Sequence, residues 1–96
     1  MLTGKQKRFL RSKANNLQPL FQIGKNGLTQ SVIEQIEEAL EAKELIKVNI
    51  LQNCGEDKNE IAQKLSEQEG MNVVQVIGNI IVLYKESIEK KRIELP

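Results

Sequence analysis

Histidine and tryptophan are absent from this 96-residue sequence, and its only aromatic residues are Phe9, Phe21 and Tyr84. Without histidine, the chain cannot form a serine–histidine or cysteine–histidine catalytic relay, and the usual zinc ligand sets are excluded. With so few aromatic side chains, a platform that stacks nucleic-acid bases, as in an RRM or OB fold, is not expected either. Common enzyme relays and base-stacking surfaces therefore do not explain this protein.

Cysteine and long apolar runs are also scarce. The single cysteine, Cys54, excludes an internal disulfide and fits a reducing compartment such as the cytosol. The longest unbroken apolar run, Ile80–Tyr84, is far shorter than the ~20 residues that span a membrane. The N-terminus is basic but lacks the apolar segment of a secretory signal. We therefore expect a cytoplasmic protein with no membrane segment.

The length and the average composition indicate one soluble domain. Ninety-six residues provide a single modest core, so residues 1–96 are expected to form one domain. Apolar residues make up 40% and charged residues 28% of the chain, as in soluble globular proteins.

The formal net charge of +1 hides an uneven distribution of charge. Residues 1–33 contain six basic residues and no acidic residue, whereas residues 34–96 contain eight basic and thirteen acidic residues. The first third of the chain is therefore expected to form a positive end that attracts phosphate through its local field.

A basic helix is predicted near the N-terminus. Within residues 2–17 the apolar residues recur at helical spacing and gather on one side of the predicted helix. Four basic residues lie on the other side: Lys5, Lys7, Arg8 and Arg11. A solvated surface is the simpler interpretation of such a face. No acidic residue interrupts these bases, however, which is unlike an ordinary salt-bridged surface helix and favours an anionic partner.

The remaining periodicities predict two further helices and four strands. One helix starts near Thr29 or Ser31 and continues through Lys43, and the next follows at 56–69. Strands are expected at 20–23, 45–51, 72–77 and 80–85, the last two joined by a two-residue hairpin turn. The order α-β-α-β-α-β-β, with a right-handed parallel crossover and a final antiparallel hairpin, predicts an α/β fold. Its mixed four-stranded sheet is expected to pack against three helices.

The acidic residues of the middle helix are expected to be solvated. Five glutamates fill its polar faces: Glu34, Glu37, Glu38, Glu41 and Glu44. Nothing nearby in the sequence would perturb their pKa or complement their charge, so neither acid–base chemistry nor metal binding is predicted for them. Residues 86–96 are highly charged and are expected to form a frayed tail.

The segment Gly24-Lys25-Asn26-Gly27 lies between a predicted strand and a predicted helix. At such a position, the unpaired N–H groups of the first helical turn and the positive end of the helix dipole can hold an anion. The glycines allow a phosphate to approach the backbone closely, and Lys25 and Asn26 add a charge and hydrogen-bonding groups. The segment is neither a Walker A motif nor a dinucleotide-binding fingerprint. A tight turn remains the alternative, although the adjoining basic helix favours a groove for a polyanionic backbone if the two share a face.

Three segments also carry a resemblance to a known family. The run LTGKQKRFLRSKANNLQPLFQIGKNGLT, then ELIKVNI and VIGNIIVLYKES, resembles the bacterial YhbY-type CRM domain over residues 2–88. This RNA-binding module is named for chloroplast RNA splicing and ribosome maturation. The resemblance implies the same α-β-α-β-α-β-β fold, related to the C-terminal domain of bacterial translation initiation factor three. It further implies RNA contacts from the GxxG loop at 24–27, and an association of stand-alone bacterial members with precursors of the large ribosomal subunit.

The residues and the resemblance together predict a monomeric RNA-binding protein that acts on structured ribosomal RNA during large-subunit assembly. No cofactor, metal, small-molecule substrate or catalysis is expected. The candidate RNA-binding residues are Gly24, Lys25, Asn26, Gly27, Thr29, Lys5, Lys7, Arg8, Arg11 and Lys85. Lys25 and the backbone of both glycines and Thr29 would hold phosphate, and Asn26 would contact a sugar or a base edge. The bases of the N-terminal helix would follow the RNA strand.

Two functions of other classes remain as alternatives. An enzyme that acts on phosphates would need a base, an acid or a metal cluster near the loop, and the sequence provides none of these. A protein-interaction module would bind basic ribosomal proteins through the acidic middle helix, and its binding would be insensitive to Lys25.

Overall fold

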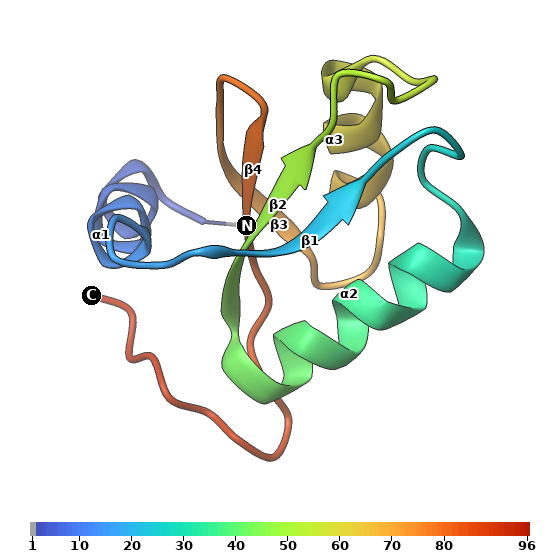
Figure 1. Cartoon of the computed structure of the whole chain (residues 1–96). Coiled ribbons are helices and arrows are strands. Elements are labelled where there is room, and N and C mark those ends of the chain that lie inside the picture. Colours follow the sequence, from blue (N-terminus) through green and yellow to red (C-terminus); the bar gives the residue numbers. More distant parts are fainter. Residues whose placement is uncertain (1) are drawn as a thin grey trace.

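The computed structural model describes residues 2–96, and its elements follow the predicted order (Figure 1). The three helices are α1 (Gly4–Ala14), α2 (Gln30–Lys43) and α3 (Lys58–Ser66). The four strands are β1 (Pro19–Ile23), β2 (Leu45–Ile50), β3 (Asn72–Ile77) and β4 (Ile80–Tyr84). Every predicted helix and strand is present, although α1 and α3 are shorter than their sequence patterns indicated.

The strands form one mixed sheet in the order β1-β2-β4-β3. β1 pairs with β2 in parallel, because α2 carries the chain back along the sheet between them. β4 pairs with both β2 and β3 in antiparallel orientation, and a turn at Gly78-Asn79 joins β3 to β4. β1 and β3 are therefore the two edges of the sheet, and the predicted α/β fold is confirmed.

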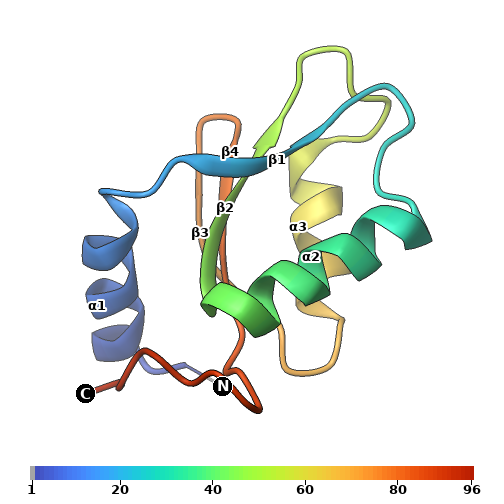
Figure 2. The same ribbon diagram turned by 60° about the horizontal axis from the view of Figure 1, so that its bottom comes forward.

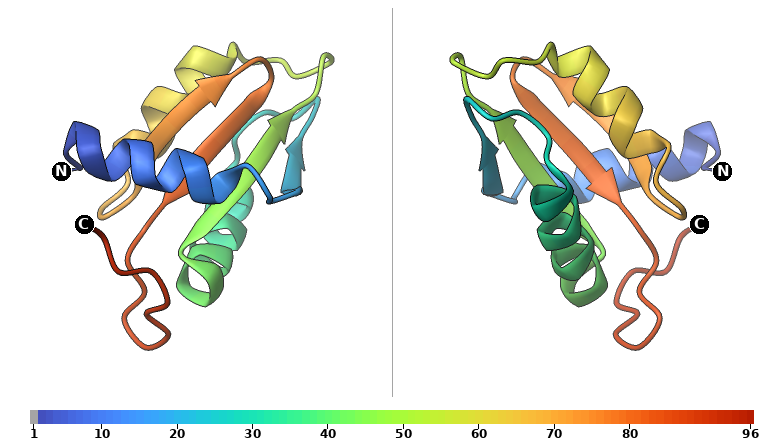
Figure 3. Two further views of the ribbon diagram at one scale, coloured as in Figure 1. Left: turned by 90° about the vertical axis from the view of Figure 1, so that its left-hand side faces the viewer. Right: turned by 90° about the vertical axis from the view of Figure 1, so that its right-hand side faces the viewer.

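Helices cover the sheet on both faces. α1 crosses one face, whereas α2 and α3 lie on the opposite face (Figures 2 and 3). Successive side chains of a strand point to opposite faces, so Ile46 and Val48 of β2 face α2 and α3, while Leu45 faces α1. The result is a three-layer arrangement with a hydrophobic core on each side of the sheet.

The two cores differ in size. The larger lies between the sheet and the helices α2 and α3, and Leu40 and Leu65 are among its fully buried side chains. The smaller lies under α1, where Leu10 packs in one cluster with Val82 of β4 and with Ile93 from the C-terminal tail. Complete burial of one such side chain contributes about 1.5–3 kcal/mol, so a single tail residue is a substantial part of the smaller core.

Side chains at the helix starts determine where α1 and α2 begin. Thr3 starts α1 with a capping box: its hydroxyl accepts the Gln6 N–H at 3.1 Å, and the Gln6 side chain accepts the Thr3 N–H at 3.0 Å. Thr29 starts α2, and its hydroxyl accepts the Val32 N–H at 3.2 Å. The sequence indicated either Thr29 or Ser31 as the N-cap of α2, and in the structure the N-cap is Thr29.

α3 begins later and ends earlier than the predicted range of 56–69. Asp57 is its N-cap and accepts the Asn59 N–H at 3.0 Å. Glu56, which was expected in the first turn, therefore lies outside the helix, and its side chain can reach another element. After the last turn the chain reverses at Gly70, which has a φ of +75°.

The C-terminal tail, residues 86–96, differs from the frayed end that its charge indicated. It contains no helix or strand, yet Ser87 and Ile93 are buried, and the chain ends near α1 (Figure 1). N–H groups of the tail donate to two carboxylates near the end of α2, those of Glu41 and Glu44. These bonds satisfy backbone groups that no strand or helix satisfies, so the tail is part of the folded domain.

Glu44 contradicts the prediction that all five glutamates of the middle helix are solvated. Its side chain is fully buried, and its carboxylate accepts the N–H groups of Ser87 at 2.9 Å, of Ile93 at 2.8 Å, and of Arg92. Burial raises the pKa of Glu44, but the three amides together lower it by more, so its pKa lies below the ordinary value. A carboxylate can accept several hydrogen bonds, which is why a buried charge is tolerated at this position.

Glu41 is half-buried and holds the first part of the tail. It accepts the N–H groups of Ile88 at 3.0 Å and Glu89 at 3.1 Å, and the Ser87 hydroxyl at 2.7 Å. The Ile88 amide, followed by the Ser87 hydroxyl, lowers the pKa of Glu41. Because Ile88 lies 47 residues along the chain, no pattern near Glu41 in the sequence indicated this partner.

Candidate nucleic-acid interface

Three connections meet at one end of the sheet, beyond the C-terminal ends of β1 and β2. They are the GKNG loop at 24–27, the segment at 51–57 and the turn at 78–79. The Leu51 N–H donates to the Ile23 carbonyl at 2.9 Å, and the Ile50 N–H donates to the Asn79 carbonyl at 2.7 Å. The GKNG loop therefore starts from a well-paired end of the sheet.

The GKNG loop is a tight turn whose last residue must be glycine. The Gly27 N–H donates to the Gly24 carbonyl at 2.9 Å and closes the turn. Gly27 has a φ of +68°, a left-handed conformation that residues with a β-carbon rarely adopt, and such a β-carbon would collide with the Glu56 carboxylate. Its N–H donates within the turn, so the structure gives Gly27 a role in the shape of the loop, and its predicted contact with a phosphate stays a prediction.

Glu56 is a residue of this site that the sequence did not reveal. Its Oε1 accepts the Leu28 N–H at 2.7 Å, and its Oε2 forms an ion pair with the Lys64 ammonium group of α3. The contact with Lys64, followed by the Leu28 amide, lowers the pKa of Glu56, and Glu56 in turn raises the pKa of Lys64. Glu56 thus connects the GKNG loop to α3. The only sequence signal was an acidic residue at the start of a predicted helix.

The outer side of the GKNG loop carries Lys25 and Asn26, which are both exposed. Within residues 2–96, no carboxylate lies within 4.0 Å of the Lys25 ammonium group. Thr29 follows with its hydroxyl bonded to the first turn of α2. An anion that approaches from solvent would therefore meet Lys25, Asn26 and the N-terminal end of α2, where the helix dipole is positive.

The basic residues of α1 lie apart from the GKNG loop. Lys5 and Arg8 are exposed, and Lys7 and Arg11 are half-buried. α1 covers the opposite face of the sheet from α2, and the GKNG loop extends beyond the far end of β1 (Figure 2). The helix and the loop therefore do not form the single groove that a shared face would have produced, because β1 lies between them.

Lys85 is also separated from the other candidate residues. It follows β4, whose last residue, Tyr84, pairs with Leu45 at the start of β2, so it lies at the end of the sheet away from the GKNG loop. There it lines an open pocket together with Glu37 and Glu69. These acidic neighbours do not favour a phosphate ligand at Lys85.

No metal centre or membrane-spanning helix is found in the part of the chain that the structure describes. Among residues 2–96, no group of three or more histidine, cysteine, aspartate or glutamate side chains is placed to hold a metal ion. None of the helices in this range is long and apolar enough to cross a membrane. Cys54 has a free, half-buried thiol that packs against the larger core.

A comparison with protein families identifies the class of protein to which this fold belongs. The chain matches the CRS1 / YhbY (CRM) domain over residues 2–85, a range that includes all seven helices and strands described here. The chain therefore belongs to the CRM domain family. This confirms the resemblance carried by the three sequence segments.

Two relatives and one solved structure match nearly the whole chain. It is 65% identical over 96 residues to the probable RNA-binding protein YqeI of Bacillus subtilis (strain 168), and the match covers 100% of both chains. It is 42% identical over 95 residues to a Haemophilus influenzae protein named RNA-binding protein, covering 99% of this chain and 95% of that one. The solution structure of the hypothetical protein SAV1595 from Staphylococcus aureus shares 58% identity and a TM-score of 0.82, covering 100% of both chains. A solved structure thus has the same fold along the entire chain.

Proposed function

We propose that this protein binds RNA and that the GKNG loop holds a phosphate of the RNA backbone. The observation that carries the proposal is an exposed Lys25 on a loop that Gly27 and Glu56 hold in one conformation, at the positive end of α2. A loop backbone that is already fixed lowers the ordering cost of binding a phosphate, and the exposed Lys25 side chain supplies the charge. Membership of the CRM family and the names of the two relatives support the same function.

The residues of the loop have different roles in this proposal. Lys25 supplies the formal charge that a phosphate requires. Gly24 accepts the Gly27 N–H and so closes the turn, and its missing side chain faces Leu51 and Asn53, so in this proposal it contributes to the shape of the loop. Asn26 has both donor and acceptor groups for a sugar or a base edge. Thr29 fixes the start of α2, and its backbone lies beside the N–H groups of the first turn that complete the anion site.

The bases of α1 provide further phosphate contacts in this proposal: Lys5, Lys7, Arg8 and Arg11. Because β1 separates α1 from the GKNG loop, an RNA that contacts both must extend past β1. Each neutralised phosphate adds to the affinity and to its dependence on salt. We therefore expect an extended footprint with several separate backbone contacts.

We further propose that the RNA is ribosomal RNA in precursors of the large subunit, bound in the cytoplasm by a monomer without catalysis. This part of the proposal rests on the resemblance to stand-alone bacterial CRM proteins. The geometry of the site supports the coarser part of the proposal, which is binding to an RNA backbone.

A protein-interaction module built on the acidic side of α2 is less well supported. Glu41 and Glu44 bind N–H groups of the tail, so their carboxylates are already paired within the domain. Of the five glutamates, Glu34, Glu37 and Glu38 remain without such a role. A basic protein partner would therefore meet a smaller acidic surface than the sequence indicated.

The proposal is tested by sedimentation and by crosslinking in cells. At low salt, the protein should co-sediment with immature large-subunit particles on a sucrose gradient. RNA crosslinked to it should be large-subunit ribosomal RNA, and the crosslinked peptides should include the GKNG loop. If the protein is found only in the free fraction while assembly is active, and no ribosomal RNA is recovered with it, the proposal is wrong.

A further inference from the structure

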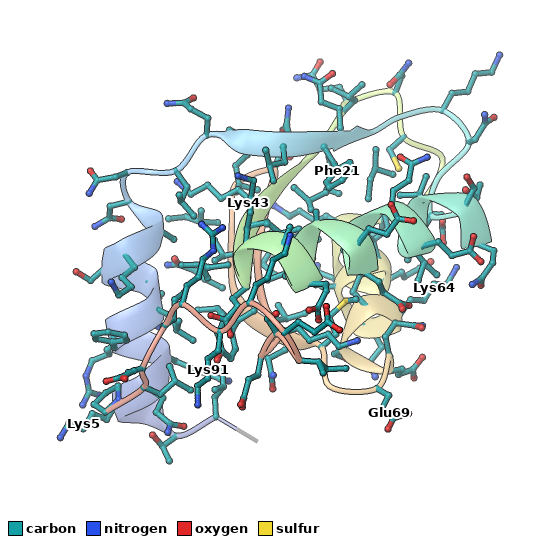
Figure 4. All side chains as sticks on the ribbon, turned by 90° about the horizontal axis from the view of Figure 1, so that it is seen from below. Lys5, Phe21, Lys43, Lys64, Glu69 and Lys91 are labelled. Atoms are coloured by element: carbon teal, nitrogen blue, oxygen red, sulfur yellow. The ribbon has the colours of Figure 1, made fainter. Side chains whose placement is uncertain are left out.

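A second group of basic residues surrounds an open pocket at the end of the molecule away from the GKNG loop. The pocket has a volume of about 460 Å³ and lies between the C-terminal ends of α1 and α2 and the tail. Three cations line it: Lys13 from α1, Lys43 from the last turn of α2, and Arg92 from the tail. Figure 4 shows Lys43 at the end of α2 that is nearer α1. The other lining residues among 2–96 are Asn16, Leu17, Leu45 and Ile93, none of which is acidic.

The tail holds Arg92 at this pocket through its backbone. The N–H groups of Arg92 and Ile93 both donate to the buried Glu44 carboxylate, and the Ile93 side chain packs in the core under α1. The Arg92 side chain is exposed and extends from this fixed point. Because amides satisfy the Glu44 carboxylate, this acid does not require the pocket cations as partners.

In the described part of the chain, the three cations form no ion pair with any carboxylate. Within the described residues, no carboxylate lies within 4.0 Å of the charged groups of Lys13, Lys43 or Arg92. Lys13 is held over the ring of Phe9, with its ammonium nitrogen 5.3 Å from the ring centre. Three cationic residues therefore line one pocket without a carboxylate partner, and an anion bound there would be attracted to all of them.

We propose that this pocket binds a phosphate of the RNA backbone, as a second anion site in addition to the GKNG loop. The Arg92 guanidinium can pair with a phosphate in bidentate geometry, and the two lysines add charge from the other sides. The half-buried Leu17 side chain offers an apolar contact for the ribose. The pocket volume lies within the range of about 300–1,000 Å³ that small-ligand sites occupy. The inference rests on the proposed RNA-binding function and names a further site for it.

A second, smaller pocket connects this site with β1. It has a volume of about 180 Å³, shares Leu17, Lys43 and Leu45 with the basic pocket, and reaches Leu20 at the start of β1. β1 is an edge strand, and its five residues span about 17 Å before the GKNG loop begins. The two anion sites thus lie at the two ends of β1. An RNA backbone that follows this edge, where Leu20 is 47% exposed, would reach both sites.

The test compares two double variants of the full chain that remove the same amount of charge. Lys43→Ala with Arg92→Ala removes two cations of the pocket, and Lys90→Ala with Lys91→Ala removes two exposed cations of the same tail. Arg92→Ala keeps the N–H that Glu44 accepts, and the ion pair of Lys91 with Glu86 that the control removes is exposed and contributes little, so neither variant should change thermal unfolding. Affinity for large-subunit ribosomal RNA should fall about tenfold or more in the pocket variant and less than about twofold in the control. The log–log salt slope of the pocket variant should be shallower by about 1.5, because two contacts of about 0.7–0.9 each are lost.

The outcomes separate this inference from the proposed function. If both double variants bind equally well while Lys25→Glu binds more weakly, the basic pocket is not an RNA site and the proposed function stands. If the unaltered protein does not bind ribosomal RNA, the proposed function fails and the inference fails with it.

The source of the phosphate is tested by nuclear magnetic resonance. The backbone amide signals of Asn16, Lys43 and Ile93 should shift when RNA is added. If they shift with inorganic phosphate but not with RNA, the pocket takes a free anion and the inference is wrong.

Discussion

At the scale of single residues, Gly27 and Glu56 together determine the shape of the GKNG loop. Gly27 adopts a left-handed φ, and the Glu56 carboxylate occupies the space in which a β-carbon of residue 27 would lie. From there Glu56 accepts the Leu28 N–H and pairs with Lys64. The position of Lys25 on the outer side of the loop depends on this arrangement.

Replacement of Gly27 by alanine should destabilise the fold by about 2–4 kcal/mol. The left-handed conformation costs about 1–2 kcal/mol for a residue with a β-carbon, and displacement of Glu56 from the Leu28 amide adds about 1–2 kcal/mol. Gly78→Ala is the matched control, because Gly78 has a φ of +56° but no atom within 4 Å of the position of a β-carbon. Urea unfolding of both variants measures the difference. Equal losses of stability would mean that the contact of Glu56 with the loop contributes nothing.

Glu44 should make the stability of the protein sensitive to acid. The pKa of Glu44 is lower in the folded state than in the unfolded chain, where it is about 4.3. The ionised carboxylate therefore stabilises the fold fully above the unfolded pKa. This stabilisation is lost as the pH falls through the folded pKa. Glu44→Gln cannot ionise. Its carbonyl oxygen can still accept hydrogen bonds, but its NH2 group places a donor against at least one of the three N–H groups that Glu44 accepts. The variant should therefore be less stable than the unaltered protein at pH 7, with a smaller difference at low pH.

Urea unfolding at several pH values between about 2.5 and 7 tests this prediction, because that window contains the unfolded pKa and the region below it. The tail should detach in the variant, which hydrogen exchange of the Ser87, Arg92 and Ile93 amides would detect. Parallel stability curves for the two proteins would show that Glu44 ionisation does not stabilise the fold. Glu41 has a similarly lowered pKa, so part of the acid sensitivity should remain in Glu44→Gln.

At the scale of elements, the spacing of apolar residues predicted the helices and strands, because their formation depends largely on neighbouring residues. All seven elements were predicted from the sequence. The signals lie within the elements themselves: apolar residues at helical spacing, the alternation in β2 and the hairpin turn at Gly78-Asn79. The tail has no periodicity, and the partners that hold it are two glutamates on α2. Its order therefore depends on contacts between residues far apart in sequence, which a local pattern cannot show. The same reason explains why Glu56 was missed.

The two charged helices should respond in opposite ways to reversal of their charge. Lys5→Glu with Arg8→Glu on α1 should weaken binding to large-subunit ribosomal RNA by about 1–3 kcal/mol, because attraction to phosphate becomes repulsion. Glu34→Lys with Glu38→Lys on α2 should leave the affinity unchanged or slightly higher. All four positions are exposed, so the fold should be retained. Glu41 is unsuitable for this comparison because it binds the tail.

Equilibrium binding of both double variants is the measurement, with circular dichroism to confirm folding. The alternative of a protein-interaction module predicts the reverse: loss of partner binding when the glutamates of α2 are changed, and no effect of the changes on α1.

At the scale of the whole molecule, the uneven charge of the sequence is distributed around the sheet. The acid-free first third forms α1, β1 and the GKNG loop, and the acidic part forms α2 and α3. The sequence predicted that the first third of the chain is positive. It did not predict that these positive residues fall into two separate groups, because only the folded chain shows that β1 lies between α1 and the GKNG loop. Nor did it indicate the pocket of Lys13, Lys43 and Arg92, whose members come from three separate elements.

The central claim, that the GKNG loop holds a phosphate of the RNA backbone, is tested most directly by the affinity of Lys25→Glu for large-subunit ribosomal RNA over a series of salt concentrations. For the unaltered protein, about four to six phosphate contacts predict a log–log slope of roughly −3 to −5. Lys25→Glu should bind about 1–3 kcal/mol more weakly and with a slope shallower by about 0.7–0.9, since one contact is lost. Its stability should be nearly unchanged, because an acidic residue near a helix N-terminus is favourable by about 0.3–1 kcal/mol. If a folded Lys25→Glu protein has the affinity and the salt slope of the unaltered protein, the GKNG loop is only a turn.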